Sequence, residues 1–143
     1  MDSSWIESLT PLELQFRSTM ATVWEEVVTR LLILGVPIAL LTLVQTRKIG
    51  SLKMILGRFE MSKVAVVLLC VSSLVFGIAH YESWGLMKVF MTTLGGLVHG
   101  YLFIKYGIHA CILIHFINNC LNSFLWAGFG ALNGVILLVV LTI

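Results

Sequence analysis

The sequence predicts an all-α integral membrane protein, a single domain over residues 1–143 built as a bundle of four to five transmembrane helices. Hydrophobic residues make up 59% of the chain and charged residues only 11%, whereas a soluble domain is about 45–50% apolar and about 25% charged. The mean hydropathy is +1.01. Because this small number of charged residues cannot cover a water-facing surface, the chain is expected to lie in the lipid bilayer. The small net charge of +2, without a basic stripe, argues against a nucleic-acid partner.

The N-terminal part is expected to lie at the membrane interface over residues 1–19, because apolar and charged positions alternate there. Within it, Thr10-Pro11-Leu12-Glu13 combines an N-cap residue, a proline at the first helical position and a capping-box glutamate. A helix is therefore predicted to begin at Pro11. The core that carries the motifs is expected over about residues 20–122, and Pro37 is expected to kink or break its first span.

Three further spans and one polar connector follow. The connector, residues 46–63, carries five basic residues and one acidic residue, and the positive-inside rule predicts that it is cytoplasmic. The second and third spans are predicted at 64–80 and 86–106, with a short turn between them. A fourth span is predicted after Gly107, and residues 131–143 form a shorter fifth apolar segment. Three glycines of the third span are expected to let a neighbouring helix approach closely: Gly95, Gly96 and Gly100.

Charged side chains interrupt the first apolar span at Glu25, Glu26 and Arg30. A charge near the bilayer centre is disfavoured by about 2.5–3.5 kcal/mol on insertion scales, so it points to function by default. The spacing of Glu26 and Arg30 allows them to pair along one helix. Glu25 points about 100° away and needs a partner from another helix.

Histidines and asparagines lie in the later spans. His80 ends the second span, and His115 and Asn119 share one face of the fourth, four residues apart. His99 and Asn118, taken singly, are interpreted as interhelical hydrogen-bonding residues. Together with the charges of the first span, however, these polar groups are too many for packing alone.

Three motifs appear in order within the apolar segments: E-E-x-x-x-R at 25–30, F-x-x-x-H at 76–80 and H-x-x-x-N at 115–119. With these and the stretch 95–102, the chain resembles the CPBP family, which includes CAAX prenyl endopeptidases and Abi-like bacteriocin-processing and immunity proteins. The resemblance implies a CAAX-protease-like core and a glutamate-dependent intramembrane endopeptidase. Two features depart from the family pattern: Thr29 replaces a common aromatic residue, and His99 stands where a small or apolar residue is usual.

The resemblance also implies roles for individual residues. Glu25 matches the catalytic glutamate, which activates a water together with His80. His115 and Asn119 match the pair that completes the site and stabilises the oxyanion. Glu26 and Arg30 match supporting residues of the first motif.

Other protease chemistries fit the sequence less well. The zincin pattern H-E-x-x-H is absent, and the apolar spans contain no Asp for an aspartyl dyad and no Gly-x-Ser placed before a suitable histidine. No cofactor and no metal are expected, although a metal held by Glu25, His80 and His115 is the open chemical alternative.

Two other functions remain as alternatives to the protease. One is a non-catalytic membrane protein of the same fold that acts in immunity, as a scaffold or as a complex subunit, and the other is a proton or ion path. The partners expected are a peptide or protein substrate, prenylated or not, and the lipid bilayer. A homo-oligomer or a larger membrane complex would supply the surface of the helices that precede the first motif in many members of the family.

Overall fold

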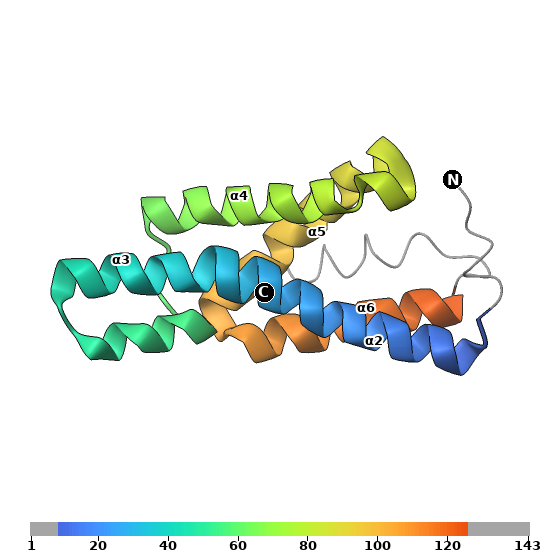
Figure 1. Ribbon diagram of the computed structural model, residues 1–143, viewed down its shortest axis with the longest axis horizontal. Coiled ribbons are helices and arrows are strands. Elements are labelled where there is room, and N and C mark those ends of the chain that lie inside the picture. The colour runs from blue at the N-terminus through green and yellow to red at the C-terminus, as the bar shows by residue number, and fades with distance from the viewer. Residues whose placement is uncertain (1–8, 126–143) are drawn as a thin grey trace.

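The computed structural model describes residues 9–125, and these residues form helices and short connections without a strand. The all-α prediction is therefore confirmed for this part of the chain. One long helix, built from α2, η1 and α3, runs the length of the bundle (Figure 1). α4 and α5 pack together beside it, and α6 packs along α2. This arrangement brings three of the helices to the middle of the long helix.

The long helix begins as predicted. Thr10 caps α2 (Pro11–Glu26): its hydroxyl oxygen accepts from the Glu13 amide, and the Glu13 carboxylate accepts from the Thr10 amide at 2.9 Å. The predicted helix from Pro11 thus continues without interruption into the long helix, and residues 1–8 lie outside the described part.

The middle of the long helix is wider than an α-helix. The π-helical segment η1 (Val27–Gly35) follows α2 directly, and α3 (Val36–Thr46) continues from it. Pro37 lies in the first turn of α3, where its missing N–H costs no α-helical bond to the preceding turn. The predicted break at Pro37 is therefore wrong, because the π-helical register before the proline lets the helix continue. Such segments occur frequently at functional sites.

The polar connector is folded back onto the bundle. It forms the 3₁₀ helix η2 (Ile49–Leu56), which packs against α3. Beyond η2, the amides of Arg58 and Phe59 donate to the carbonyls of Phe103 and Ile104 at 3.3 and 3.1 Å. The Ile104 carbonyl lies in the last turn of α5, where carbonyls lack helical partners, and the Phe103 carbonyl also accepts from the Gly107 amide at 2.9 Å. The connector is therefore part of the folded core.

α4 (Lys63–Ala79) and α5 (Tyr81–Tyr106) form an antiparallel pair joined at His80. The predicted turn between them is a short helical stretch that ends at Gly85, where φ is 75° and the helix changes direction. Ser62 caps the start of α4 by accepting from the Ala65 amide at 3.1 Å. His80 therefore lies at the tip of this hairpin.

Glycines set the distance between α4 and α5. A Cβ on Gly96 would lie 3.1 Å from Ser73, and one on Gly100 would collide with Leu69, so the predicted close approach is confirmed at both positions. Gly95 faces open space, and the prediction is wrong there. Gly77 of α4 was not singled out, but a Cβ on it would lie 2.8 Å from the carbonyl oxygen of Val89.

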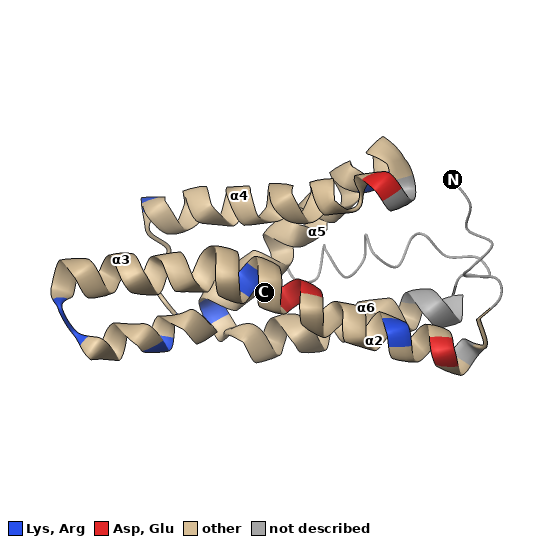
Figure 2. Cartoon of the chain, in the orientation of Figure 1, with Lys and Arg blue, Asp and Glu red and all other residues tan. Residues whose placement is uncertain are grey.

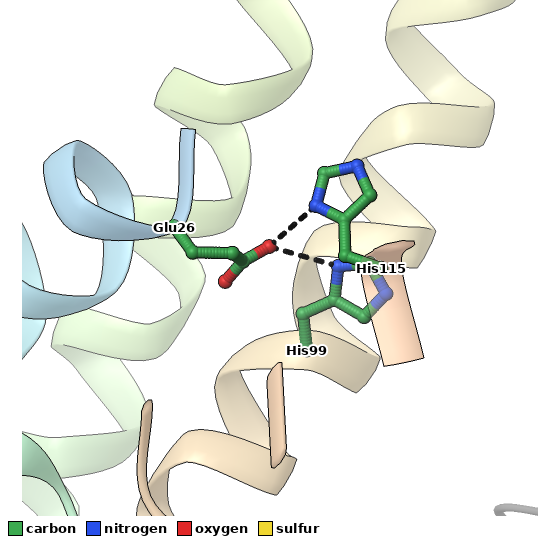
Figure 3. Close-up of side chains that lie close together, drawn as sticks. All are labelled: Glu26, His99 and His115. Atoms are coloured by element: carbon green, nitrogen blue, oxygen red, sulfur yellow. Dashed lines mark hydrogen bonds and ion pairs between the residues drawn. The ribbon is translucent and has the colours of Figure 1, made fainter. Parts of the chain in front are cut away.

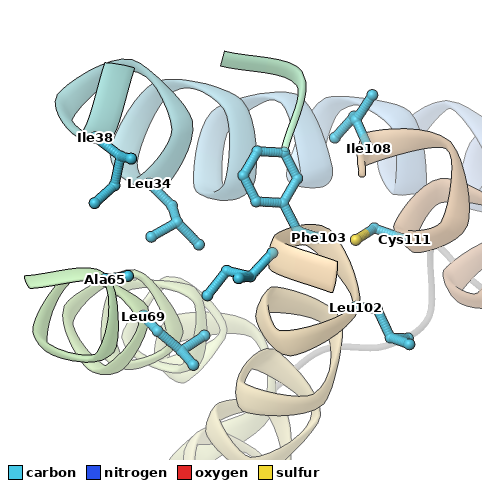
Figure 4. Packing of buried hydrophobic residues seen from close by; sticks show 9 residues of the cluster. Leu34, Ile38, Ala65, Leu69, Leu102, Phe103, Ile108 and Cys111 are labelled. Carbon is cyan, nitrogen blue, oxygen red and sulfur yellow. The ribbon is translucent and has the colours of Figure 1, made fainter. Parts of the chain in front are cut away.

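The apolar core lies between the connector and the polar residues of the long helix. It gathers side chains from η1, α3, α4, α5 and α6 (Figure 4): Leu34, Ile38, Ala65, Leu69, Leu102, Phe103, Ile104, Ile108 and Cys111. α6 (Ile108–Leu125) is the fourth predicted span. The predicted fifth segment, residues 131–143, falls outside the described residues.

Two of the helices are long and apolar enough to cross a membrane, Leu12–Thr46 and Gly85–Tyr106. The apolar stretches of the other two described helices are shorter, at Lys63–Ala79 and Ile108–Leu121. Large apolar side chains are also exposed over much of the bundle, including Val67, Leu74 and Ile78 of α4. An apolar outer surface of this extent is typical of a protein that faces lipid.

Candidate active site

The polar residues that the sequence singles out meet at the end of α2, where the π-helical segment begins. Glu25 and Glu26 come from α2, His80 from the tip of α4, and His115 and Asn119 from α6. His99 of α5, which the sequence suggested was an isolated hydrogen-bonding residue, joins the same cluster. One polar site therefore draws on four helices.

Glu25 faces two imidazoles. One carboxylate oxygen lies 3.7 Å from Nε2 of His80, and the other lies 3.5 Å from Nε2 of His115. The expectation that Glu25 needs partners from other helices is thus confirmed by the geometry. Both distances are at or beyond the limit of a direct hydrogen bond, so the two imidazoles face Glu25 as ion-pair neighbours and are not bonded tightly to it.

The tip of α4 orients His80. Nδ1 of its ring lies 2.8 Å from the carbonyl oxygen of Phe76, and this pair is a hydrogen bond only if Nδ1 carries a proton. In the neutral ring Nε2 is then the lone-pair nitrogen, and it faces Glu25. The Phe76 ring also packs edge-on against His80, with centroids 4.9 Å apart. The spacing of the F-x-x-x-H motif thus provides both contacts.

Glu26 holds the second histidine (Figure 3). One of its oxygens lies 2.8 Å from Nδ1 of His115 and 3.2 Å from Nδ1 of His99. The centroids of the two imidazole rings are 4.8 Å apart and their planes are tilted by 35°. The Glu26 side chain is fully buried. A carboxylate on Nδ1 keeps the proton there and leaves Nε2 to face Glu25, the arrangement in which a carboxylate fixes the tautomer of a histidine.

Arg30 provides the counter-charge for Glu26. Its Nε lies 3.2 Å from the second carboxylate oxygen, and both side chains are fully buried, so the predicted pairing along one helix is confirmed. Nη1 donates to the Ser72 hydroxyl at 2.7 Å, and that hydroxyl donates to the Thr29 carbonyl at 2.6 Å. This chain of bonds ties α4 to the long helix beside the site.

Asn119 lies one helical turn beyond His115 and is held by the long helix. Its side-chain amide donates to the Thr22 hydroxyl at 2.8 Å, and Thr22 in turn donates to the Ser18 carbonyl at 2.9 Å. One of the two amide protons of Asn119 is thereby used. The carboxamide is fixed beside the cluster, on the α2 side of it.

Three donor atoms in the described residues have spacings that suit a metal ion: those of Glu26, His99 and His115 lie within 4.8 Å of one another. This set shares only His115 with the alternative metal ligands expected from the sequence. A divalent ion there would stand beside the buried Arg30 guanidinium, which already pairs with Glu26. The present contacts of Glu26 are one hydrogen bond to His115 and an ion pair with Arg30, whose positive charge balances that of the carboxylate.

Sequence reasoning missed Thr22, Ser72 and the part that His99 plays. Each is a polar residue on an otherwise apolar helix, and Thr22 lies four residues before Glu26, on the face that also carries Arg30. That spacing could have identified Thr22 as a residue of the site. Ser72 and His99 carry no comparable local signal, because their contacts are made only when α4 and α5 pack against the long helix.

Comparison with known proteins agrees with this geometry. A family model described as type II CAAX prenyl endopeptidase Rce1-like matches residues 8–121, which include all seven residues of the three motifs. Neither the curated proteins nor the solved structures include a match to the chain. The matched family has an all-helical membrane fold, as the sequence predicts for this protein. The chain belongs to the Rce1-like family of type II CAAX prenyl endopeptidases.

Proposed function

We propose that the protein is a metal-independent, multi-pass intramembrane endopeptidase in which Glu25 and His80 activate a water molecule. The observation that carries the proposal is the pair of imidazole nitrogens facing one carboxylate, at 3.7 Å from His80 and 3.5 Å from His115. Family membership supports the reaction class. A carboxylate and two imidazole nitrogens that face one another are acceptors to which a water can donate its hydrogens while its oxygen attacks.

The hydrolytic step follows from these groups. The water oxygen attacks the carbonyl carbon of the scissile peptide bond while a water proton passes to Glu25, with His80 as the neighbouring acceptor. The resulting tetrahedral oxyanion collapses, the C–N bond breaks, and the proton moves to the leaving amine nitrogen. A carboxylic acid and an amine are released, and Glu25 is again a carboxylate.

We assign different roles to His115 and Asn119, because an imidazole and a carboxamide differ in the protons that they carry. With Nδ1–H bonded to Glu26, a neutral His115 has no second proton, so it donates to the oxyanion only as an imidazolium. Asn119 donates an amide proton to Thr22, and a carboxamide N–H is a group that can stabilise an oxyanion. We therefore assign His115 to proton transfer near Glu25, with Glu26 and Arg30 as supporting residues.

The test is a substrate screen in membranes that contain the wild-type protein or a Glu25→Gln variant. A membrane-anchored peptide library is added, and the cleavage products are identified by mass spectrometry. Loss of a general base costs about 10²–10⁴-fold in rate, so Glu25→Gln, His80→Ala and His115→Ala are each expected to abolish detectable cleavage. Addition of a metal chelator is expected to leave the wild-type rate unchanged.

Matched controls separate chemistry from folding. Glu60→Gln and His109→Ala make the same chemical changes at exposed positions and are expected to cleave at the wild-type rate. Full activity in Glu25→Gln would overturn the catalytic role of Glu25, whereas the absence of cleavage by the wild-type protein would favour the non-catalytic alternative. Inactivation by a chelator, reversed by added zinc, would instead assign the chemistry to a metal held by Glu26, His99 and His115.

A further inference from the structure

We propose that Glu26, His99 and His115 form a binding site for Zn²⁺, and that an ion bound there reversibly inhibits cleavage. The inhibition rests on the proposed endopeptidase function, whereas the binding of the ion does not. Three features of the described residues carry the proposal: two imidazoles converge on one carboxylate, Arg30 supports that carboxylate from its other side, and His115 connects it to Glu25.

Two histidines converge on a single carboxylate oxygen (Figure 3). Nδ1 of His115 and Nδ1 of His99 lie 2.8 and 3.2 Å from the same oxygen of Glu26. The contact with His115 is a hydrogen bond, but among the described residues Nδ1 of His99 has no hydrogen-bond partner. The His99 side chain is only 8% exposed. A buried polar atom that lacks a hydrogen bond calls for an explanation, and a bound ion is one.

The set of donor atoms is one that zinc prefers. Zinc in proteins binds imidazole nitrogens and carboxylate oxygens at about 2.0–2.2 Å in a tetrahedral arrangement, which places the ligand atoms about 3.4 Å apart. One donor atom from each of Glu26, His99 and His115 lies within 4.8 Å of the other two. Small side-chain rotations therefore bring all three around one ion. Magnesium and calcium fit this set poorly, because they require a shell of oxygen ligands.

The surroundings of Glu26 suit a metal-bound carboxylate. In the middle of the long helix, two acidic residues stand against one basic residue, Arg30 (Figure 2). Nε of Arg30 lies 3.2 Å from the second oxygen of Glu26. Carboxylates that bind metal ions are in turn held by hydrogen bonds of this kind. The guanidinium thus orients Glu26 through one oxygen, while the other oxygen faces the two imidazoles.

A bound ion changes which nitrogen of His115 carries the proton. The ion bonds to the lone pair of Nδ1, so the single proton of the neutral ring must lie on Nε2. That nitrogen lies 3.5 Å from Glu25, and its N–H then donates to the carboxylate that serves as the proposed base. The lone pair of Nε2, which the proposed proton transfer requires, is lost. Metal binding and proton transfer at His115 therefore exclude each other.

The binding of the ion can be measured without cleavage. Detergent-purified protein is treated with a chelator and dialysed against Zn²⁺, and the bound zinc is measured by mass spectrometry. We expect a single zinc ion per chain. His99→Phe and His99→Gln should bind it at least about 100-fold more weakly, because loss of an outer hydrogen-bond partner alone costs about 10–100-fold in metal affinity.

Matched variants test whether the ion binds at this site. Glu25→Gln is expected to bind zinc as the wild type does, as is His109→Ala at an exposed position. Cys70→Ala is the control for an exposed thiol and should also leave binding unchanged. Circular dichroism of each variant verifies that its helices are intact before the zinc contents are compared.

Inhibition is measured in the cleavage assay, with each variant compared with its own zinc-free rate. Zn²⁺ is expected to slow the wild-type protein by about 10²-fold or more, as the loss of a group that transfers protons does, and a chelator should restore the rate. The rate of His99→Gln, which lacks one imidazole of the site, should change little at the same concentration of Zn²⁺.

Three results would overturn the proposal. The first is zinc binding that persists in His99→Phe and disappears in Glu25→Gln or His80→Ala, which would assign the ion to Glu25, His80 and His115. The second is a chain that binds no zinc, and the third is a cleavage rate that rises with zinc. Absence of cleavage by the wild-type protein would instead refute the endopeptidase, and the dialysis experiment would still decide whether the metal site exists.

Discussion

The two imidazoles that face Glu25 each have one ring nitrogen already engaged. Nδ1 of His80 meets the Phe76 carbonyl and Nδ1 of His115 meets Glu26, each at 2.8 Å. Both rings therefore turn Nε2 toward the same carboxylate. Orientation of this kind lowers the reorganisation that the reaction requires, because the groups stand in place before a peptide arrives. The buried Phe76 and Glu26 are therefore important because they hold the two imidazole rings in this orientation.

His99 is predicted to be a positioning residue for His115. His99→Phe keeps an aromatic ring beside His115 but removes the group 3.2 Å from Glu26. A small misplacement of a catalytic group can cost up to about 10²-fold in rate, so we expect kcat to fall about tenfold with KM little changed, and the pH profile of cleavage to shift. His99→Gln, which restores a donor, should recover part of the rate. An unchanged kcat and pH profile in His99→Phe would limit His99 to packing.

Ser72 is predicted to stabilise the fold through Arg30. Its hydroxyl accepts from the buried guanidinium and donates to the long helix, so Ser72→Ala leaves a buried charged donor without that partner, at a cost of about 1–3 kcal/mol. Ser73→Ala is the matched control, since the Ser73 hydroxyl bonds only its own helix at Leu69. Thermal unfolding in detergent should show the larger loss for Ser72→Ala. Equal losses would mean that the link to Arg30 contributes nothing measurable.

At the scale of elements, local patterns predicted the helices well. The start of α2 followed from its capping box, and the ends of α4 and α5 fell close to the changes in polarity at residues 64 and 106. The π-helical segment and the docking of the connector were not predictable in this way. Both depend on contacts between distant segments, such as the bond from the Phe59 amide to Ile104. Likewise, spacing placed Glu26 beside Arg30 but could not tell which histidines would meet it.

Close packing of α4 on α5 makes Gly77 the most demanding glycine of the hairpin. An added Cβ would meet Thr93 and lie 2.8 Å from the Val89 carbonyl oxygen, and such overpacking costs about 1–3 kcal/mol. Gly77→Ala should therefore lower the midpoint of thermal unfolding. Gly95→Ala is the control, because a Cβ there meets nothing within 4 Å and alanine is the better helix former. A stable Gly77→Ala protein would show that the two helices can separate without loss.

Across the whole molecule, the exposed apolar residues of α4 distinguish a membrane protein from a soluble helical bundle. Val71, near the middle of α4, is 45% exposed. On a soluble protein an exposed valine changed to lysine has an effect of only about 0.5 kcal/mol, whereas a lysine at the centre of a membrane span costs about 2.5–3.5 kcal/mol.

We predict that Val71→Lys sharply reduces the amount of protein that resists alkaline carbonate extraction from membranes. The matched change Ile49→Lys should have little effect, because Ile49 is 79% exposed and lies in the basic connector, where one more positive charge agrees with a cytoplasmic position. A Val71→Lys protein that remains folded after carbonate releases it from the membrane would contradict the transmembrane placement of α4. The site would then belong to a water-exposed bundle, because His80 is carried at the end of that helix.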